Sequence, residues 1–284
     1  MELCELKTIR PLLERHGFRF SKALGQNFLI ADWVPRDIAA GSGADAGSGV
    51  LEIGPGIGCL TQELAAFAGH VTAVELDDRL IPVLAETVGG LDNVDIVHVD
   101  VMVLDLPSLV REKFPGLHPM VCANLPYNIT SPVLTMLLES GLFTSITVMI
   151  QREVARRICA RPGTADYGAF TLLAEYYAET RTLFDVPPSC FVPQPKVTSS
   201  VIRMDLRSAP PVDTDPALLF RVIRACFVQR RKTLSNGLAA AFPLPKASLE
   251  ELIASCGFDA CVRGETLDLA SFARLADAIG EALA

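Results

Sequence analysis

The chain of 284 residues has few features that would tie it to a membrane or an export route. No stretch approaches the roughly 18 consecutive apolar residues of a membrane-spanning helix. Residues 1–7 lack the charged-then-apolar layout of a secretory signal. Internal repeats and low-complexity tracts are also missing. Because half of the residues are hydrophobic and a fifth are charged, we expect a globular protein of the cytoplasm, without a membrane partner.

The eight cysteines are not grouped as metal or disulfide sites require. They are scattered along the sequence, without a Cys-x-x-Cys pair or a neighbouring histidine cluster. Cys256 and Cys261 are the nearest pair, and a structural metal site there would need two more ligands in register. We therefore expect free thiols in a reducing compartment and no bound metal.

The net charge of −8 disfavours nucleic acid as a partner when it is taken as a whole. Its distribution argues differently. Residues 181–246 contain ten Lys and Arg but only four Asp and Glu. A basic section within an acidic chain keeps phosphate binding open.

Short apolar runs alternate with helical patterns over the first 150 residues. We predict strands at residues 50–53, 71–76, 94–99, 121–123 and 145–150, with helices at 60–68, up to 87 and at 132–139 between them. This alternation predicts a parallel sheet with helices on both faces and right-handed crossovers. Functional groups are then expected at the carboxyl ends of the strands.

The remaining sequence predicts fewer strands. Helices at 151–160 and 167–177 precede an extended, proline-containing segment at 184–196, and a strand at 199–206 closes the sheet. Ser208-Ala209-Pro210-Pro211 is the best linker in the chain, and the residues after it are helical. We predict an α/β domain over residues 1–208 and a small all-helical domain over 209–284.

Three of the predicted strand ends carry groups suited to a nucleotide-like ligand. Gly54, Gly56 and Gly58 form a loop whose backbone N–H groups can approach such a ligand. Cys59 stands where the dinucleotide fingerprint has its last glycine, which favours S-adenosylmethionine over NAD. Glu75 can accept from both ribose hydroxyls, and Asp100 from an adenine amine. Glu75 or Asp100 alone would be an ordinary charged loop residue. Because suitable groups stand at the ends of three successive strands, we favour a cofactor-binding site.

The strand at 121–123 ends in Asn124-Leu125-Pro126-Tyr127. This corner offers carbonyl acceptors beside a flat ring, which suits a planar substrate with an amino group. Asn and Pro are ordinary turn residues, so a turn with a packing tyrosine is the alternative. Gln26 and Asn27 are a second unusual polar pair, because adjacent amides between a glycine and apolar residues compete for backbone groups.

Taken together, five motifs resemble the adenine N6,N6-dimethyltransferases of small-subunit ribosomal RNA. They are Glu-Ile-Gly-Pro-Gly-Ile-Gly at 52–58, Glu-Leu-Asp at 75–77, Asn-Leu-Pro-Tyr-Asn at 124–128, Val-Pro-Pro-Ser with Phe191 and Pro-Lys-Val at 186–197, and Gln-Arg-Arg-Lys-Thr-Leu at 229–234. The resemblance runs from about residue 22 to the C-terminal helices. It implies a seven-stranded, Rossmann-like class I methyltransferase sheet.

The resemblance also implies roles for individual residues. The S-adenosylmethionine site would be lined by Gln26, Asn27, Leu29, Gly54, Gly56, Glu75, Asp100 and Asn124. Asn124 and the backbone carbonyl of Leu125 or Pro126 would accept hydrogen bonds from the adenine N6 amine. Tyr127 and Phe191 would stack on the two faces of the base.

The basic residues would bind RNA phosphates. These are Lys196, Arg221, Arg224, Arg230, Arg231 and Lys232. Without the resemblance, a basic run of three would be read as a solvated helix face. Two departures from the family pattern, Val99 in place of glycine and Thr198 in place of aspartate, remove no proposed functional group.

The implied function is transfer of two methyl groups to each of two adjacent adenosines near the 3′ end of small-subunit ribosomal RNA. The partner would be an immature ribosomal subunit, and the enzyme a monomer without metal. Two alternatives remain. One is a resistance-type methylase of large-subunit RNA, which the Gln-Arg-Arg-Lys-Thr-Leu motif disfavours. The other is a noncatalytic RNA-binding factor, which would be expected to lose Asn-Leu-Pro-Tyr or the cofactor acids.

Overall fold

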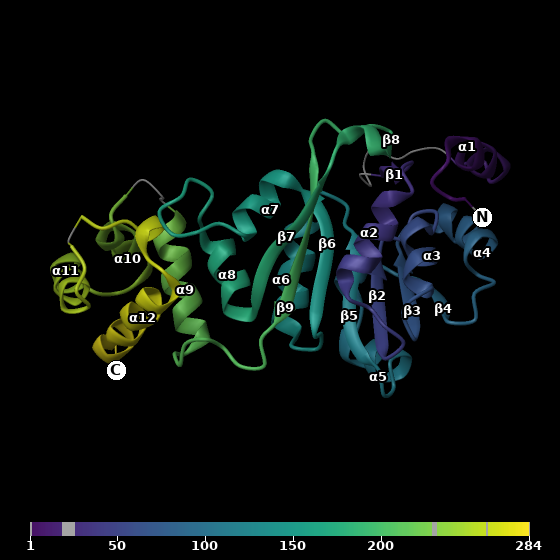
Figure 1. Ribbon diagram of the computed structural model, residues 1–284. Helices are drawn as coiled ribbons and strands as arrows, with labels where there is room; N and C mark the ends of the chain where they lie inside the picture. The colour runs from purple at the N-terminus through teal and green to yellow at the C-terminus, as the bar shows by residue number, and fades with distance from the viewer. Residues whose placement is uncertain (1, 19–25, 229–231, 260, 284) are drawn as a thin grey trace. The chain divides into compact units, whose positions relative to one another are not determined.

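The computed structural model describes residues 2–18, 26–228, 232–259 and 261–283. The chain divides into two compact units (Figure 1). The sheet unit comprises residues 1–155 and 180–206, and the helical unit comprises residues 156–179 and 207–284. The last junction, between residues 206 and 207, lies next to the expected boundary at 208. Residues 156–179 differ from expectation, because they group with the C-terminal helices.

Seven strands form the main sheet of the sheet unit, in the order β4-β3-β2-β5-β6-β9-β7. Strands β2 to β6 run parallel, and β9 runs antiparallel to β6. Their bounds are β2 Ser48–Ile53, β3 His70–Glu75, β4 Val94–His98, β5 His118–Asn124, β6 Ser145–Gln151, β7 Ala178–Val186 and β9 Ser199–Leu206. The predicted α/β class and the number of strands are confirmed.

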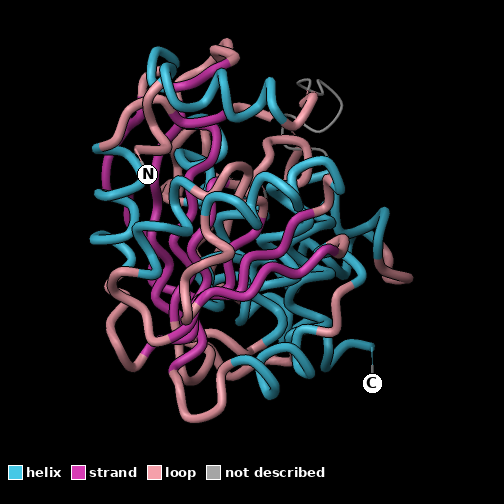
Figure 2. The backbone as a smooth tube through the Cα atoms, turned by 90° about the vertical axis from the view of Figure 1, so that its right-hand side faces the viewer, coloured by secondary structure: helices cyan, strands magenta, loops and turns pink. Residues whose placement is uncertain are grey.

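Burial explains why the central strands read as continuous apolar runs. Every residue of β2 is buried, and so are nearly all residues of β6, because helices cover both faces of the sheet. Figure 2 shows helices on both sides of the strands. The helices of this unit are α1 Leu6–Arg15, α2 Trp33–Ser42, α3 Cys59–Ala65, α4 Ile81–Thr87, α5 Leu106–Lys113, α6 Thr130–Ser140 and the start of α7 Arg152–Ile158, with short turns η1 Asp78–Leu80, η2 Val101–Val103 and η3 Pro188–Cys190.

Strand β7 and helix α5 are larger elements that the sequence did not predict. Strand β9 does not close the sheet, because β7 lies beyond it at the edge. The residues of β7 are mostly exposed or half-buried, so they lack the apolar run that identifies a central strand. Helix α5 was also missed, although Asp105 caps it by accepting a hydrogen bond from the backbone N–H of Ser108.

The strand order reverses between β2 and β5, and this reversal positions the site. From β2 the chain proceeds to β3 and β4 on one side, whereas β5 and β6 follow on the other. At such a switch point the loops after the two central strands diverge and leave a crevice at their carboxyl ends. Gly54 follows β2, and Asn124 is the last residue of β5.

A separate two-stranded sheet joins two segments that are far apart in the sequence. Strand β1 (Phe28–Leu29) pairs antiparallel with β8 (Phe191–Val192), so that Leu29 lies opposite Phe191. The N–H of Ile30 extends the pairing by donating to the Cys190 carbonyl at 2.8 Å. The segment that follows Gln26 and Asn27 is thereby fixed next to the segment that carries Phe191.

The helical unit is built on its own apolar core. It contains α8 Ala169–Tyr177, α9 Pro216–Val228, α10 Leu234–Ala241, α11 Lys246–Ser255, α12 Leu269–Leu283 and the turn η4 Gly264–Thr266. Tyr167, Leu219 and Phe272 are buried in this core, and the Tyr167 hydroxyl donates to the Leu267 carbonyl at 2.8 Å. Residues around α8 therefore pack with the C-terminal helices. None of the described helices is long and apolar enough to cross a membrane.

Candidate active site

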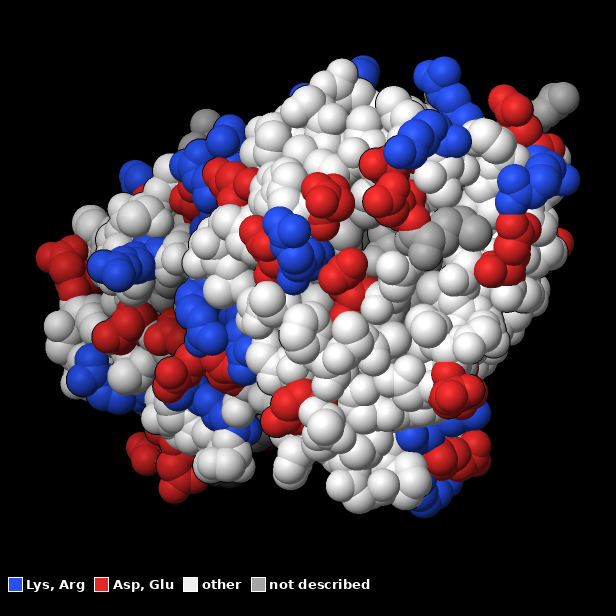
Figure 3. Space-filling view, turned by 45° about the vertical axis from the view of Figure 1, so that its right-hand side comes forward, with Lys and Arg blue, Asp and Glu red and all other residues white. Residues whose placement is uncertain are grey.

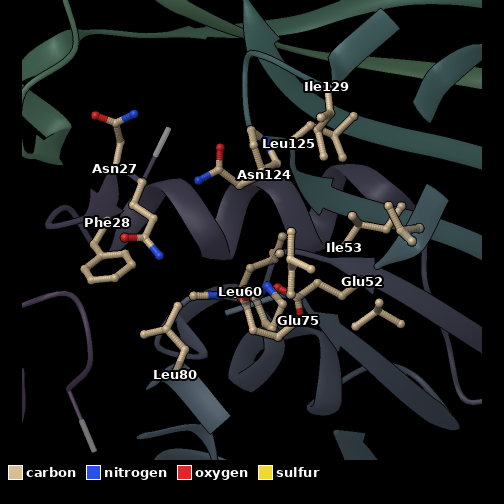
Figure 4. A pocket seen from close by; sticks show the side chains of 18 of the residues that line it. Asn27, Phe28, Glu52, Ile53, Leu60, Glu75, Leu80, Asn124, Leu125 and Ile129 are labelled. Carbon is tan, nitrogen blue, oxygen red and sulfur yellow. Dashed lines mark hydrogen bonds between the residues drawn. The ribbon is translucent and has the colours of Figure 1, made fainter. Parts of the chain in front are cut away.

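One cavity opens at the carboxyl ends of β2, β3 and β5 (Figure 4). Its lining comes from the segments after these strands and from β1, β8 and η2. Thirteen lining residues matter to the chemistry that the sequence suggests: Gln26, Asn27, Leu29, Glu52, Gly54, Gly56, Glu75, Asp100, Asn124, Leu125, Pro126, Tyr127 and Phe191. All predicted cofactor and catalytic residues thus lie around one cavity, together with Glu52.

The glycine loop owes its path to backbone geometry that other residues adopt rarely. Gly54, Gly56 and Gly58 all have positive φ, at 68°, 63° and 90°. At Gly56 a Cβ atom would also lie 3.3 Å from the Phe28 ring. Glycine at this position lets β1 pack directly on the loop, so the loop and residues 26–29 form one wall of the cavity.

Glu75 occupies the end of β3 and is only 7% exposed. Its carboxylate accepts hydrogen bonds from the backbone N–H groups of Asp77 at 2.8 Å and Gly56 at 3.4 Å. Burial raises the pKa of this carboxyl above its usual value, and the two N–H groups oppose that shift. The side chain is therefore held toward the glycine loop. Asp100 lies two residues after β4, where it accepts from the N–H of Met102 at 2.9 Å.

Glu52 is a site residue that the sequence analysis did not single out. It lies within β2, is 1% exposed and lines the cavity near Glu75 (Figure 4). Burial raises the pKa of Glu52 to about 8, and the negative charge of Glu75 adds to this shift. No described residue donates a hydrogen bond to its Oε2 atom. A glutamate among the buried residues of β2 was the available signal in the sequence. A cationic ligand nearby would lower the pKa of Glu52 again.

A buried aspartate links β1 to the end of β3. Asp77 is 5% exposed, and it accepts a hydrogen bond from the Gln26 amide at 2.6 Å. The Arg79 guanidinium donates to both of its oxygens, at 2.7 and 2.5 Å. These donors hold the pKa of Asp77 below its usual value. Gln26 therefore reaches the loop after β3, and it also lines the cavity.

In the turn after β5, the backbone carbonyls of Leu125 and Pro126 differ in their hydrogen bonding. The Pro126 carbonyl already accepts from the Ile129 N–H and the Thr130 hydroxyl, each at 3.2 Å. No described residue donates to the Leu125 carbonyl or pairs with the Asn124 side-chain amide. Leu125 is itself fixed, because its N–H donates to Met149 in β6 at 3.1 Å. The acceptors available to a ligand are thus Asn124 and the Leu125 carbonyl.

The two aromatic residues at this corner differ in exposure. Tyr127 is half-buried, and its hydroxyl lies 2.7 Å from the Ser199 hydroxyl. Burial raises the pKa of Tyr127 above its usual value. Phe191 is 3% exposed and belongs to the apolar core that also contains Phe28. Both rings line the cavity, so it offers flat apolar surfaces close to the Asn124 acceptors.

Comparison with known proteins identifies the group to which this architecture belongs. The family model described as ribosomal RNA adenine dimethylase matches residues 17–276. The chain belongs to this family. It is therefore a methyltransferase that uses S-adenosylmethionine, which confirms the predicted enzyme class and cofactor.

Relatives of this dimethylase match it over almost their whole length. A protein of Alkaliphilus oremlandii named ribosomal RNA small subunit methyltransferase A is 44% identical, with 98% of each chain covered. A protein of Shouchella clausii with the same name is 48% identical, with 94% of this chain and 92% of the relative covered.

Solved structures agree on the fold of the dimethylase. A dimethyladenosine transferase from Plasmodium falciparum is 24% identical, with a TM-score of 0.73 and coverage of 87% of this chain and 95% of that chain. The 23S ribosomal RNA methyltransferase ErmE is 26% identical, with a TM-score of 0.68 and coverage of 89% and 99%. The class I methyltransferase fold expected from the motifs is confirmed.

The predicted RNA-binding residues of the dimethylase fall into three groups. Lys196, Arg224 and Lys232 are exposed and form no ion pair with any described residue. Arg221 donates to the Ala241 carbonyl at 2.6 Å and lies 4.3 Å from the Phe242 ring centre, so its guanidinium also has a structural partner. Arg230 and Arg231 lie outside the described residues.

Internal ion pairs reduce the basic excess of residues 181–246. Arg181 and Arg203 both pair with Asp205, Arg207 pairs with Glu179, and Lys246 lies 3.7 Å from Glu250. On the face drawn in Figure 3, Lys and Arg side chains lie next to Asp and Glu in most of the charged clusters. The charged residues on this face therefore do not form a broad basic surface.

Proposed function

We propose that this enzyme transfers two methyl groups to N6 of each of two adjacent adenosines near the 3′ end of small-subunit ribosomal RNA. Relatives named for the small subunit support this RNA, since they are 44–48% identical over more than nine-tenths of the chain. The observation that supports adenine N6 is the corner at which Asn124 and the Leu125 carbonyl are available as acceptors beside Tyr127.

The residues around the cavity fit S-adenosylmethionine. The glycine loop leaves room for close approach of a ligand to backbone N–H groups. The Glu75 carboxylate can accept from ribose hydroxyls, and Asp100 can accept from the adenine amine of the cofactor. A positively charged ligand beside the buried carboxyls of Glu52 and Glu75 would favour their ionised forms. Bound S-adenosylmethionine supplies a methyl group on a positively charged sulfur, which is a good leaving group.

The chain's own acceptors make the adenine amine reactive. The N6 lone pair is delocalised into the ring, so the amine is a poor nucleophile while it stays planar. The Asn124 side-chain oxygen and the Leu125 carbonyl would accept hydrogen bonds from its two N–H groups and favour a pyramidal nitrogen. Neither oxygen is basic enough to keep a proton, so N6 would release one proton to water after the methyl group is transferred. Positive charge develops on this nitrogen as the new bond forms, and acceptors placed there stabilise the transition state. Pro126 is unsuited to this role because its carbonyl already accepts two hydrogen bonds.

The target base must leave its stack to reach a cavity at a sheet edge. Tyr127 would stack on one face of the base, and Phe191 would close the other. Stacking on an aromatic ring is worth about 1–3 kcal/mol per base, which offsets part of the cost of unstacking. The flat apolar walls would thus hold the base with its amine toward Asn124.

Recognition of the RNA is assigned to exposed cations. Lys196 in the sheet unit and Arg224 and Lys232 in the helical unit would contact phosphates, and so would Arg230 and Arg231. We propose that the substrate is an immature small subunit and that the enzyme acts as a monomer in the cytoplasm. The helical unit would then serve in RNA binding rather than in methyl transfer.

The direct test is to incubate the protein with labelled S-adenosylmethionine and unmethylated small ribosomal subunits, then analyse the nucleosides. We expect N6,N6-dimethyladenosine. Monomethyladenosine alone would contradict the transfer of two methyl groups. Labelling of large-subunit RNA in a parallel reaction would support the resistance-type alternative, and no labelling of either RNA would support a noncatalytic RNA-binding factor.

A further inference from the structure

Ser199 contacts the catalytic corner from a different strand. Its side chain is fully buried at the start of β9, and its hydroxyl lies 2.7 Å from the Tyr127 hydroxyl. Strand β6 separates β5 from β9 in the sheet, and Gln151 of β6 lies opposite Ser199. The hydrogen bond therefore joins the turn that follows β5 to the start of β9, past the carboxyl end of β6.

Water has poor access to this hydrogen bond, because Ser199 is fully buried and Tyr127 is half-buried. Burial raises the pKa of the Tyr127 phenol, so the hydroxyl stays neutral and keeps its proton. A neutral phenol can donate to Ser199 or accept from it. Either arrangement removes rotational freedom from the Tyr127 ring, which otherwise belongs to a turn of exposed and half-buried residues.

The backbone around Ser199 is well anchored. The N–H of Arg152 donates to the Thr198 carbonyl at 3.0 Å, and β9 continues the sheet on β6 through seven aligned residue pairs. Phe191 lies on the same connection between β7 and β9, eight residues before Ser199. A bond from Tyr127 to Ser199 thus ties one aromatic wall of the cavity to the segment that carries the other.

We propose that Ser199 is a positioning residue that fixes the Tyr127 ring and thereby sets the width of the slot for the target adenine. This inference rests on the proposed function, because it concerns the base that enters the cavity. Ser199 itself is not among the residues that line the cavity. Its effect is on the rate of transfer from a correctly placed base, whereas cofactor binding depends on other walls of the cavity.

The test is a double-mutant cycle between Ser199→Ala and Tyr127→Phe, assayed on unmethylated small ribosomal subunits. Each single substitution removes one hydroxyl and should lower kcat about five- to tenfold, the effect of one hydrogen bond. The double variant should be no slower than the singles, because both remove the same contact. Ser199→Thr retains a hydroxyl and should recover most of the rate.

The controls separate positioning from folding. Ser200→Ala removes the neighbouring buried hydroxyl, which donates to Asp185 at 2.5 Å, and should leave kcat unchanged. The Kd for S-adenosylmethionine should stay within twofold of wild type in every variant. If Ser199→Ala does not fold, the comparison of Tyr127→Phe with wild type still tests the contact.

Two results would overturn the inference. One is a wild-type kcat in Ser199→Ala or Tyr127→Phe. The other is a double variant whose loss is the product of the single losses. An inactive wild-type protein would instead contradict the proposed function, so the two failures are distinguishable.

Discussion

At the scale of single residues, methyl transfer depends on acceptors that the protein leaves available. Asn124 and the Leu125 carbonyl remain available at the end of β5, whereas the Pro126 carbonyl is satisfied internally. The sequence motif alone could not distinguish Leu125 from Pro126, since both carbonyls follow the same asparagine. The difference comes from the turn into α6, which points the Ile129 N–H and the Thr130 hydroxyl at Pro126.

Replacing Asn124 by alanine should abolish methyl transfer while cofactor binding survives. The substitution removes one acceptor from the developing charge, and removal of one such group typically costs about 100- to 1,000-fold in rate. Asn124→Asp retains an acceptor oxygen and should be less impaired. Single-turnover rates with saturating cofactor, together with the cofactor Kd, test the prediction. Near-normal turnover of Asn124→Ala would refute the acceptor role.

Replacing Glu52 by glutamine should change how stability depends on pH. Its pKa rises from 4.5 to about 8 on folding, so the folded state keeps a proton that the unfolded state loses. Stability is therefore lost as the pH rises from about 4.5 to 8. Glu52→Gln cannot ionise and should be more stable than wild type at pH 8 by roughly 2–4 kcal/mol, with little difference near pH 4.5.

Urea denaturation of the cofactor-free protein at several pH values measures this difference. Glu112→Gln, on the exposed surface of α5, is the matched control and should follow the wild-type curve. If the free energy of unfolding of Glu52→Gln has the same pH dependence as that of wild type, Glu52 is ionised in the folded protein and the prediction is wrong.

At the scale of elements, the sequence predicted the strands that end at the site and the edge strand β4, but it missed β1, β7 and β8. Strands β2, β3, β5 and β6 are buried on both faces, so their composition identifies them. Strand β7 is largely exposed, and β1 and β8 are two residues each. Such short or polar strands depend on their partners, and pairing between residues 28 and 192 leaves no local pattern.

The link between β1 and β3 predicts that Asp77 supports cofactor binding without contacting the reacting atoms. Asp77→Ala removes the acceptor shared by Gln26 and Arg79, so the Gln26 side chain loses its hydrogen bond to the loop after β3. We expect the Kd for S-adenosylmethionine to rise about five- to tenfold, while kcat at saturation changes little. Asp78→Ala, an exposed neighbour, is the control. An unchanged Kd in Asp77→Ala would contradict the supporting role.

At the scale of the whole molecule, we assign methyl transfer to the sheet unit and RNA binding to the helical unit. The sheet unit contains the complete cavity, and all of its lining residues fall within that unit. The sequence indicated a helical C-terminal region, but it held no sign that residues 156–179 pack there. Residues 156–179 belong to the helical unit because Tyr167, Leu172 and Tyr176 are buried in its core. In the sequence, these apolar residues are equally compatible with packing against the sheet.

The exposed cations of the helical unit predict a specific salt dependence. Arg224→Gln and Lys232→Gln should each weaken RNA binding and reduce the slope of log K against log salt by about 0.7–0.9 for each phosphate that the residue neutralises. Lys246→Gln is the control, because Lys246 already lies 3.7 Å from Glu250. Binding isotherms on small subunits at several salt concentrations provide the slopes. Unchanged slopes in both variants would argue against phosphate binding by these residues.

The measurement that tests the proposed function most directly is the position of the modified bases in ribosomal RNA. Unmethylated small and large subunits are incubated with the wild-type enzyme and S-adenosylmethionine, and fragments of both RNAs are analysed by mass spectrometry. We predict two adjacent N6,N6-dimethyladenosines near the 3′ end of small-subunit RNA and none in large-subunit RNA. Dimethyladenosine at a large-subunit position, or at separated positions in the small subunit, would contradict the proposed function.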